Sequence, residues 1–485
     1  MSERGIVNDR DRLISRLRAA LGEEAVITQP GSLLVYESDG LTAYRARPLM
    51  VVMPADTAET AAAVTLLAEA KIPFVARGAG TGLSGGALAL DGAAIISLAR
   101  MRRILSIDVP GRLARVQPGV VNVELSAAAA PHGLYYAPDP SSQTVCTIGG
   151  NVAENAGGPH CLKYGTTTNH IAGLTVVLSD GSVAELGRPG GEEMGLDLVG
   201  VFVGSEGTFG IATEIAVRLL PVPDAVETLL ALFDDVDDAS RAVTAIIGAG
   251  LLPAALEMVD GEAIRAVEAS AYAAGLPTDV AGALVIEFDG PAAAVHDEAR
   301  QAEQLCLVGG AREVQRATEE AHRQRLWYAR KKAFGAMGRI APDLLVQDAV
   351  VPRSRLPETL RSIYEIAGRY GLRMCNMFHA GDGNLHPTIV FDRRDPDLVH
   401  RVEAASAEMM RVCVDAGGTI TGEHGVGLDK REYMAMVFSD AEMAVMCDIR
   451  RVFDPAGLAN PAKVLPLRIC REWAGPATRR PVEAV

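Results

Sequence analysis

A glycine-rich loop between two short apolar runs limits the fold of this chain more than any other feature. The loop spans Arg77–Ala87 and contains GTGLSG at residues 80–85, which matches the pattern GxGxxG. In a dinucleotide-binding βαβ unit this pattern opens a helix, and a crossover of a dozen or more residues leads to the next parallel strand. Here the next apolar run begins near Ala93, which leaves no room for that helix. The spacing disfavours a Rossmann fold and predicts a loop whose backbone N–H groups surround a phosphate, with a plain glycine turn as the alternative.

Two further segments have the same character. Residues 147–158 read TIGGNVAENAGG and follow the proline-rich run PDPSS at 138–142, and residues 204–211 read GSEGTFGI. Small residues let a ligand approach the main chain closely. Three such loops suit a long, flat ligand that lies against backbone, and they make a plain turn at the first loop a weaker interpretation.

Composition excludes several classes of protein. The chain has 485 residues, enough for two or three domains, and its net charge of −15 argues against a general nucleic-acid surface. No apolar run reaches the roughly 18–20 residues of a membrane span, and the charged N-terminus does not resemble a secretory signal. Seven scattered cysteines form no CxxC pair. We therefore expect a cytoplasmic protein without a disulfide framework or an iron–sulfur cluster of its own.

A change of pattern after Pro221 and Pro223 predicts a domain boundary. Beyond it, apolar strands alternate with helices, and a long amphipathic helix is expected over about residues 312–339. The predicted fold is α+β. It has a first domain over residues 1–221, a second domain over 222–430 and a helical segment over 431–485 that returns to the first domain.

The second half of the chain carries the reactive side chains. The run HAGDGNLH at 379–386 places His379 and His386 on either side of a tight turn, and GEHGVG at 422–427 contains Glu423 and His424. Two imidazoles and a carboxylate are a recognised ligand set for a divalent metal. From the spacing alone, the alternative of isolated, hydrogen-bonded histidines stays open.

The order of these loops resembles that of the FAD-linked oxidases with a vanillyl-alcohol-oxidase type of flavin domain. The resemblance rests on the loop Arg77–Ala87, the stretch 138–158, Lys163-Tyr164-Gly165 and GSEGTFGI. It implies a two-part FAD-binding domain and a cap domain for the substrate. Because the first loop contains no histidine, we expect FAD to be bound non-covalently. The implied cofactor-binding residues are Arg77, Gly78, Gly80, Thr81, Gly82, Pro138, Gly149, Gly150, Asn151, Ala153, Asn155, Gly157, Gly207, Ile211 and Asn460.

The C-terminal motifs resemble those of D-lactate, D-2-hydroxyglutarate and glycolate dehydrogenases, with the greatest overall likeness to the flavin-binding chain of glycolate oxidase. This likeness covers nearly the whole chain. It implies that His379, His386 and Glu423 hold a divalent metal such as Zn, Mn or Fe, that His424 is the catalytic base, and that Arg330 binds the substrate carboxylate. A solvated helix face is the alternative for Arg330, which adjoins two lysines.

Two departures from the family pattern bear on the substrate and the flavin. Gln347 stands where the 2-hydroxyglutarate-type relatives carry a lysine, which favours glycolate or D-lactate over a dicarboxylate. Ala462 replaces the usual glycine of Asn-Pro-Gly-Lys, and a slightly altered backbone turn near the flavin is expected there.

The resemblance predicts a dehydrogenase of a small 2-hydroxy acid that passes electrons to a partner subunit or a quinone. Flavin and iron–sulfur partner subunits, and through them contact with the inner face of the membrane, are the expected associations. One alternative is a D-lactate dehydrogenase that works alone. A second is a non-catalytic FAD subunit of an electron-transfer complex, which would not need the histidine motifs.

Overall fold

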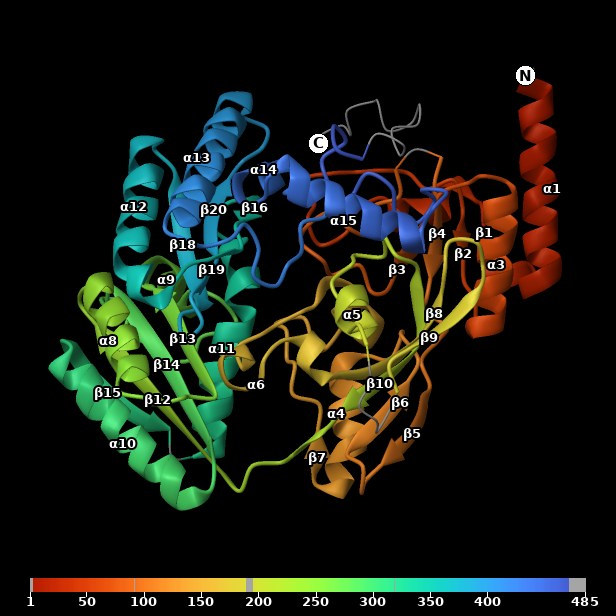
Figure 1. Ribbon diagram of the computed structural model, residues 1–485. Coiled ribbons are helices and arrows are strands. Elements are labelled where there is room, and N and C mark those ends of the chain that lie inside the picture. The colour runs from red at the N-terminus through yellow and green to blue at the C-terminus, as the bar shows by residue number, and fades with distance from the viewer. Residues whose placement is uncertain (1–2, 91, 189–194, 318, 471–485) are drawn as a thin grey trace. The chain divides into compact units, whose positions relative to one another are not determined.

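The computed structural model describes residues 3–90, 92–188, 195–317 and 319–470, and the chain forms two compact units (Figure 1). The first unit comprises Met1–Ala156, Thr166–Val222 and Glu423–Val485, and the second comprises Gly157–Gly165 and Pro223–Gly422. Relative to the predicted boundaries, residues 157–165 lie in the second unit and residues 423–430 in the first. No helix of the described residues is both long enough and apolar enough to cross a membrane.

One sheet of the first unit holds the glycine-rich loop. Its strand order is β1-β2-β4-β3, in which β2, β4 and β3 are parallel, and the strands are β1 (Val26–Ile27), β2 (Val51–Val52), β3 (Phe74–Arg77) and β4 (Ala94–Ser97). The helices α1 (Glu3–Leu21) and α3 (Thr57–Glu69) share its hydrophobic core. Asp56 caps α3 by accepting the backbone N–H of Glu59 at 2.9 Å. The described residues between β3 and β4 form no helix, which confirms the argument against a Rossmann turn.

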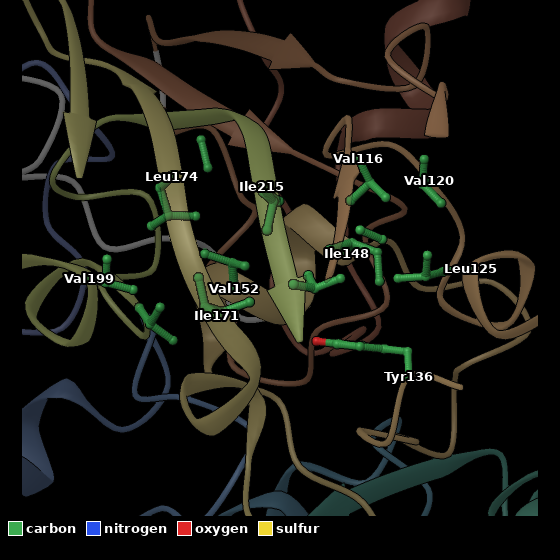
Figure 2. Packing of buried hydrophobic residues seen from close by; sticks show 14 of the residues in the cluster. Val116, Val120, Leu125, Tyr136, Ile148, Val152, Ile171, Leu174, Val199 and Ile215 are labelled. Carbon is green, nitrogen blue, oxygen red and sulfur yellow. The ribbon is translucent and has the colours of Figure 1, made fainter. Parts of the chain in front are cut away.

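A second sheet of the same unit is antiparallel throughout, with the order β5-β6-β10-β8-β9. Its core contains Val116, Leu174 and Ile215 from the strands and Ile148 and Val152 from α5 (Figure 2). Asp180-Gly181, a residue pair typical of hairpin turns, joins β8 to β9. The elements are β5 (Ile104–Asp108), β6 (Leu113–Val116), β8 (Ile171–Val177), β9 (Val183–Leu186), β10 (Ile211–Arg218), α4 (Asn122–Ala129), α5 (Ile148–Glu154), α7 (Leu198–Phe202) and the small pair β7 (Leu134–Tyr135) and β11 (Leu220–Pro221).

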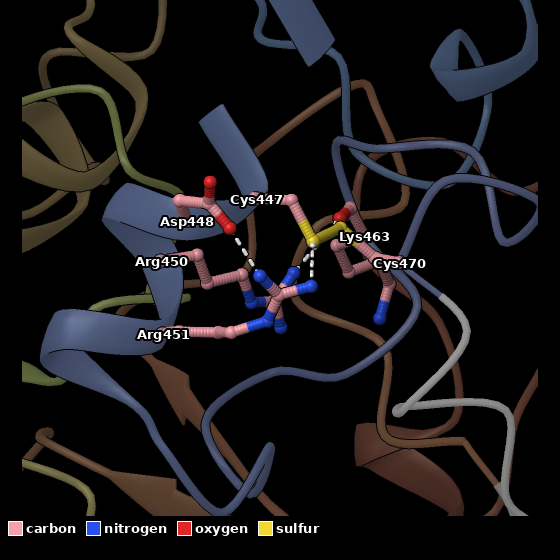
Figure 3. Close-up of a disulfide and its surroundings, with 6 residues drawn as sticks. All are labelled: Cys447, Asp448, Arg450, Arg451, Lys463 and Cys470. Carbon is pink, nitrogen blue, oxygen red and sulfur yellow. Dashed lines mark hydrogen bonds and ion pairs between the residues drawn. A yellow bond between two sulfur atoms is a disulfide. The ribbon is translucent and has the colours of Figure 1, made fainter. Parts of the chain in front are cut away.

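The last segment of the chain returns to the first sheet through α14 (Met434–Val437) and α15 (Asp440–Phe453). Backbone hydrogen bonds join Phe74 of β3 to Leu458 and Asn460 at 2.9 and 2.8 Å. Cys447 of α15 and Cys470 form a disulfide beside Arg450 and Arg451 (Figure 3). The sequence reasoning did not predict this pair, and the other five cysteines form no disulfide within the described residues.

The second unit is built on one antiparallel sheet with the order β15-β12-β14-β13-β18-β19-β17, to which β20 and β16 are added through β18. The helices α9 and α11 pack on one face through Leu230, Val259 and Val285 of the strands. The strands are β12 (Ala225–Phe233), β13 (Ala255–Asp260), β14 (Gly282–Gly290), β15 (Ala311–Ala317), β16 (Asp343–Val346), β17 (Ala349–Val350), β18 (Arg373–His379), β19 (Asn384–Leu385) and β20 (Pro387–Phe391). The helices are α6 (Cys161–Tyr164), α8 (Val236–Gly248), α9 (Gly261–Glu268), α10 (Ala292–Val308), α11 (Glu320–Met337), α12 (Leu356–Arg369) and α13 (Pro396–Asp415).

One element differs from its prediction. The long helix expected from about residue 312 begins only at Glu320, because Ala311–Ala317 pairs with β12 as the edge strand β15. Arg330 remains on the helix α11, as predicted.

Candidate active site

The first two glycine segments lie against each other in the first unit. A Cβ atom on Gly78 would come within 2.4 Å of Thr147 Oγ1, and one on Gly149 within 2.5 Å of Pro118 Cβ. Real side chains do not approach so closely, so only glycine permits this contact. The start of α5, where Thr147 accepts the N–H of Gly150 at 3.3 Å, therefore stands beside the start of the first loop.

Asn460 connects the first loop, the third glycine segment and the C-terminal return. Its Nδ2 donates to the carbonyl oxygens of Gly86 at 2.9 Å and Glu206 at 2.7 Å, and its own N–H donates to Phe74. The N–H of Glu206 donates to the carbonyl of Ala153 at 2.8 Å. Four of the segments predicted to bind the cofactor are thus joined by hydrogen bonds of Asn460 and Glu206.

The side chain of Arg77 stabilises the conformation of the first loop. Its side chain is buried, its Nη2 donates to the Ser38 carbonyl at 2.7 Å, and its guanidinium lies over the ring of Tyr36. A Cβ atom on Gly80, whose φ is +70°, would meet that Nη2 at 2.3 Å. The arginine therefore fixes the loop conformation, and this contact explains why Gly80 must be a glycine.

The remaining predicted cofactor residues have varied surroundings. The Nδ2 of Asn122 donates to the Pro138 carbonyl at 2.9 Å and to Asn151 Oδ1 at 3.0 Å. Asn155 ends α5 in the left-handed conformation, and Ile211 is a core residue that begins β10. Gly157 belongs to the second unit, where the neighbouring Lys163 and Tyr164 bind Asp289. Thr81, Gly82 and Gly207 belong to the loops described above, and Gly207 has a φ of +71°.

Two glutamates face these loops, and the sequence reasoning missed both. Glu206 accepts the N–H groups of Val426 and Gly427, each at 2.7 Å. Burial, together with the nearby Glu206 and Asp39, raises the pKa of Glu154 well above its usual value. The sequence does contain a signal for both glutamates, because each is an acidic residue in a segment made otherwise of small or apolar residues.

In the turn Asn460–Lys463, two residues other than glycine have a positive φ. Ala462 has a φ of +63°, in the left-handed region that favours glycine, and Asn460 has a φ of +41°. Lys463 is fully buried and donates to the Leu88 carbonyl at 2.8 Å and to Asn460 Oδ1 at 3.1 Å. Burial lowers the pKa of this lysine to about 7, against the opposing effect of Asp39 and Glu206.

Gly82 offers a direct test of the flavin loop. A Cβ atom there would meet its nearest neighbour, Glu154 Oε1, only at 3.8 Å, so Gly82→Ala should fold normally. If the loop lies on the FAD pyrophosphate, the added methyl group occupies ligand space, and FAD should bind about tenfold or more weakly. Titration of the apoprotein with FAD, monitored by flavin fluorescence, measures this affinity.

Gly248→Ala is the control, since Gly248 has open space around its Cβ position and lies in α8 of the other unit. Equal FAD affinity in both variants would contradict the assignment.

The second unit brings the two predicted histidine ligands together. His379 ends β18, and His386 stands between β19 and β20 on the far side of the turn. Their rings are edge to face with centroids 5.1 Å apart, and both side chains are buried. Gly383 has a φ of +80°, which the tight turn between the two histidines requires.

A buried glutamate on the neighbouring strand β13 holds His379. Glu257 Oε1 is 2.7 Å from His379 Nδ1, and Glu257 Oε2 is 2.5 Å from Arg330 Nη2. Burial alone would raise the pKa of Glu257. The contacts with His379 and Arg330 lower this pKa by more than burial raises it, so the net shift is downward and the group is a carboxylate. Arg330 is only 5% exposed, which rules out a solvated helix face for this residue.

Asp348 is the corresponding acidic neighbour of His386. Its Oδ1 is 3.7 Å from His386 Nδ1, and its Oδ2 accepts the Thr421 hydroxyl at 2.6 Å and the Gly422 N–H at 2.9 Å. A peptide bond joins Gly422 to Glu423, with which the last segment of the first unit begins. Within that segment, His424 Nε2 is 3.9 Å from Glu423 Oε1.

Gln347 precedes Asp348 in the chain, but its side chain binds a residue of α13. Its side chain is buried and its Nε2 donates to the hydroxyl of Ser406 on α13. This amide carries no charge.

Comparisons with known proteins assign both parts of the chain to known domain families. Residues 48–187 match the FAD binding domain family, and residues 222–464 match the C-terminal domain of the FAD linked oxidases. The chain is 44% identical to glycolate oxidase subunit GlcD of Escherichia coli K12, over 96% of this chain and 93% of that protein. It is 34% identical to D-lactate dehydrogenase of Anaerostipes hadrus, over 87% of this chain and 90% of that protein.

Among solved structures, p-cresol methylhydroxylase with bound substrate has the same fold. The TM-score is 0.80 at 18% identity, and the match covers 95% of this chain and 98% of that one. The similarity supports the predicted α+β architecture with a vanillyl-alcohol-oxidase type of flavin domain. With both domain families matched in order and relatives of this identity along nearly the whole length, the chain belongs to the FAD-linked oxidases and is a flavin-dependent oxidoreductase.

Proposed function

We propose that this protein oxidises a small 2-hydroxy acid, glycolate or D-lactate, to the corresponding 2-oxo acid. The observation that carries the proposal is the buried group of Arg330, Glu257 and His379, with His386 beside it. A buried arginine next to a metal-type histidine pair suits a substrate that presents a carboxylate and a hydroxyl group on adjacent carbons. The names of the relatives, glycolate oxidase subunit and D-lactate dehydrogenase, support the same substrate class.

Arg330 is proposed to bind the substrate carboxylate. Glu257 engages its Nη2, and its Nε is buried and donates to none of the described residues. A guanidinium has five N–H donors in a planar fork that matches a carboxylate. Donors therefore remain for a second carboxylate, and the ion pair with Glu257 fixes the orientation of the fork.

His379, His386 and Glu423 are proposed to hold a divalent metal, with Zn, Mn and Fe as candidates. Two imidazoles and a carboxylate form a donor set that such cations accept. Because His379 Nδ1 faces Glu257, this histidine would bind a metal through Nε2. When bound, the metal would polarise the hydroxyl oxygen of the substrate as a Lewis acid.

His424 is proposed to be the general base. An imidazole titrates near neutral pH and can take the hydroxyl proton as the C–H bond of the same carbon breaks. The bound flavin would accept the hydride, so that two electrons leave the substrate and one proton stays on the histidine. Glu423, next in the chain, has an oxygen within 4 Å of the His424 ring and can stabilise the resulting imidazolium.

The electron acceptor is proposed to be a partner subunit or a quinone. The relatives of highest identity among those compared are named as subunits, which supports an enzyme of several chains. Flavin and iron–sulfur partner chains at the inner face of the membrane fit this proposal.

Anaerobic reduction of the flavin tests the proposal. The FAD-loaded protein should lose its visible flavin absorbance on addition of glycolate or D-lactate, and an artificial acceptor should restore it. D-2-hydroxyglutarate should react more slowly, because Gln347 supplies no charge for a second carboxylate. A non-catalytic FAD subunit would bind FAD without any bleaching by these acids, and that result would overturn the proposed function.

A further inference from the structure

Glu257 is a single buried carboxylate that contacts two residues with different proposed roles. It lies in the middle strands of the second unit, its side chain is completely buried, and it is directly opposite His379 in the register of β13 and β18. A carboxylate removed from water is costly unless it is paired and hydrogen-bonded. Here one oxygen faces the imidazole of His379 and the other faces the guanidinium of Arg330.

The two partners have different proposed tasks. His379 is a predicted metal ligand, and Arg330 is the predicted anchor of the substrate carboxylate. A carboxylate that accepts the Nδ1–H of a histidine fixes the tautomer, directs Nε2 toward a metal and raises the basicity of the ring. A carboxylate that pairs with one edge of an arginine limits the rotation of the guanidinium.

We propose that Glu257 is a positioning residue that orients both His379 and Arg330, so that metal affinity and substrate binding depend on one buried carboxylate. The part of this inference that concerns substrate binding rests on the proposed function. The part that concerns metal affinity rests on the contact between Glu257 and His379, and metal affinity can be measured without turnover.

The same unit contains a matched control. Glu287 of β14 is also buried, and it also binds a histidine and an arginine, His160 at 3.2 Å and Arg323 of α11 at 3.6 Å. The hydroxyl of Thr228 and the indole N–H of Trp327 donate to it as well, both at 2.6 Å. Glu287→Gln removes a comparable buried charge from contact with the same helix, but it leaves His379 and Arg330 untouched.

The experiment compares Zn²⁺ affinity and steady-state kinetics in the FAD-loaded full-length protein. For Glu257→Gln we expect Zn²⁺ to bind about 10–100-fold more weakly, and KM for glycolate or D-lactate to rise while FAD affinity stays unchanged. Glu257→Asp keeps the charge on a shorter side chain, so both losses should be smaller. Glu287→Gln should lower the unfolding temperature without a selective effect on Zn²⁺ or on KM.

Several outcomes would overturn the inference. Wild-type affinity for Zn²⁺ in Glu257→Gln, equal losses in Glu257→Gln and Glu287→Gln, or no Zn²⁺ binding by the wild-type protein would each do so. If Glu257→Gln does not fold, Glu257→Asp decides the question by the same measurements. Failure of the proposed function is a separate result, namely normal Zn²⁺ binding in a wild-type protein whose flavin neither acid reduces.

Discussion

Replacement of His386 by alanine is expected to remove the bound metal and to lower kcat/KM for the 2-hydroxy acid by about a thousandfold. A Lewis acid on the reacting oxygen contributes several kcal/mol, and each 1.36 kcal/mol corresponds to a factor of about ten in rate. His386 is buried beside His379 and Asp348, and alanine offers no replacement ligand. FAD content should stay the same, because the loops predicted to bind FAD belong to the other unit, apart from Gly157.

Metal analysis and flavin absorbance of the purified variants separate these effects. His400→Ala is the control, because the side chain of His400 is 79% exposed on α13 and has no predicted role. A chelator should reduce the activity of the wild-type protein and a divalent metal should restore it. If His386→Ala retained both its metal content and its kcat/KM, the predicted metal site would be wrong.

Local patterns were sufficient to predict the parts of the molecule that depend on local backbone geometry. The absence of a helix after GTGLSG followed from the few residues before Ala93, and the turn at Asp180-Gly181 defined a hairpin. The three glycine segments could be recognised separately, because each glycine requirement is a property of its own loop. Their meeting point is non-local, since Asn460 binds Gly86 across 374 residues of sequence.

Errors arose where tertiary pairing decides the outcome. Ala311–Ala317 is rich in charged and polar residues that suit a helix, but it pairs with β12 at the edge of the sheet, where such residues are tolerated. The disulfide between Cys447 and Cys470 has no spacing signal, because the return of the chain past α15 brings the two residues together.

The buried acids of the second unit could not be assigned partners from the sequence. Glu257 and His379 are 122 residues apart, and only the register of β13 against β18 places them opposite each other. What the sequence does contain is an acidic residue inside an apolar strand, in ALEMVD for Glu257 and in LVIEFDG for Glu287. A charge in such a run indicates a buried pair, because an unpaired carboxylate would destabilise the strand. Neither sequence run identifies the residue with which its glutamate pairs.

The second large effect is expected for His424→Ala, which should slow reduction of the flavin by the substrate about 10²–10⁴-fold, the usual contribution of a general base. This variant differs from His386→Ala in its other properties. Metal and FAD should both remain, since Glu423 and the glycine loops are unchanged, and KM should change little. Anaerobic stopped-flow measurement of flavin absorbance gives the rate of the chemical step directly, without the step in which electrons leave the flavin.

Rescue by free imidazole distinguishes a base from a structural residue. Alanine removes the ring and leaves space for a small molecule, so added imidazole should accelerate flavin reduction in His424→Ala in a concentration-dependent manner. It should have no effect on His386→Ala, in which the metal is absent. His132→Ala, at an exposed position of the first unit, serves as the control and should reduce at the wild-type rate. A His424→Ala protein that reduces as fast as the wild type would show that the proton goes to another group. Because Glu154 is a buried acid with a raised pKa in the flavin-binding unit, Glu154→Gln would then be the next variant to measure.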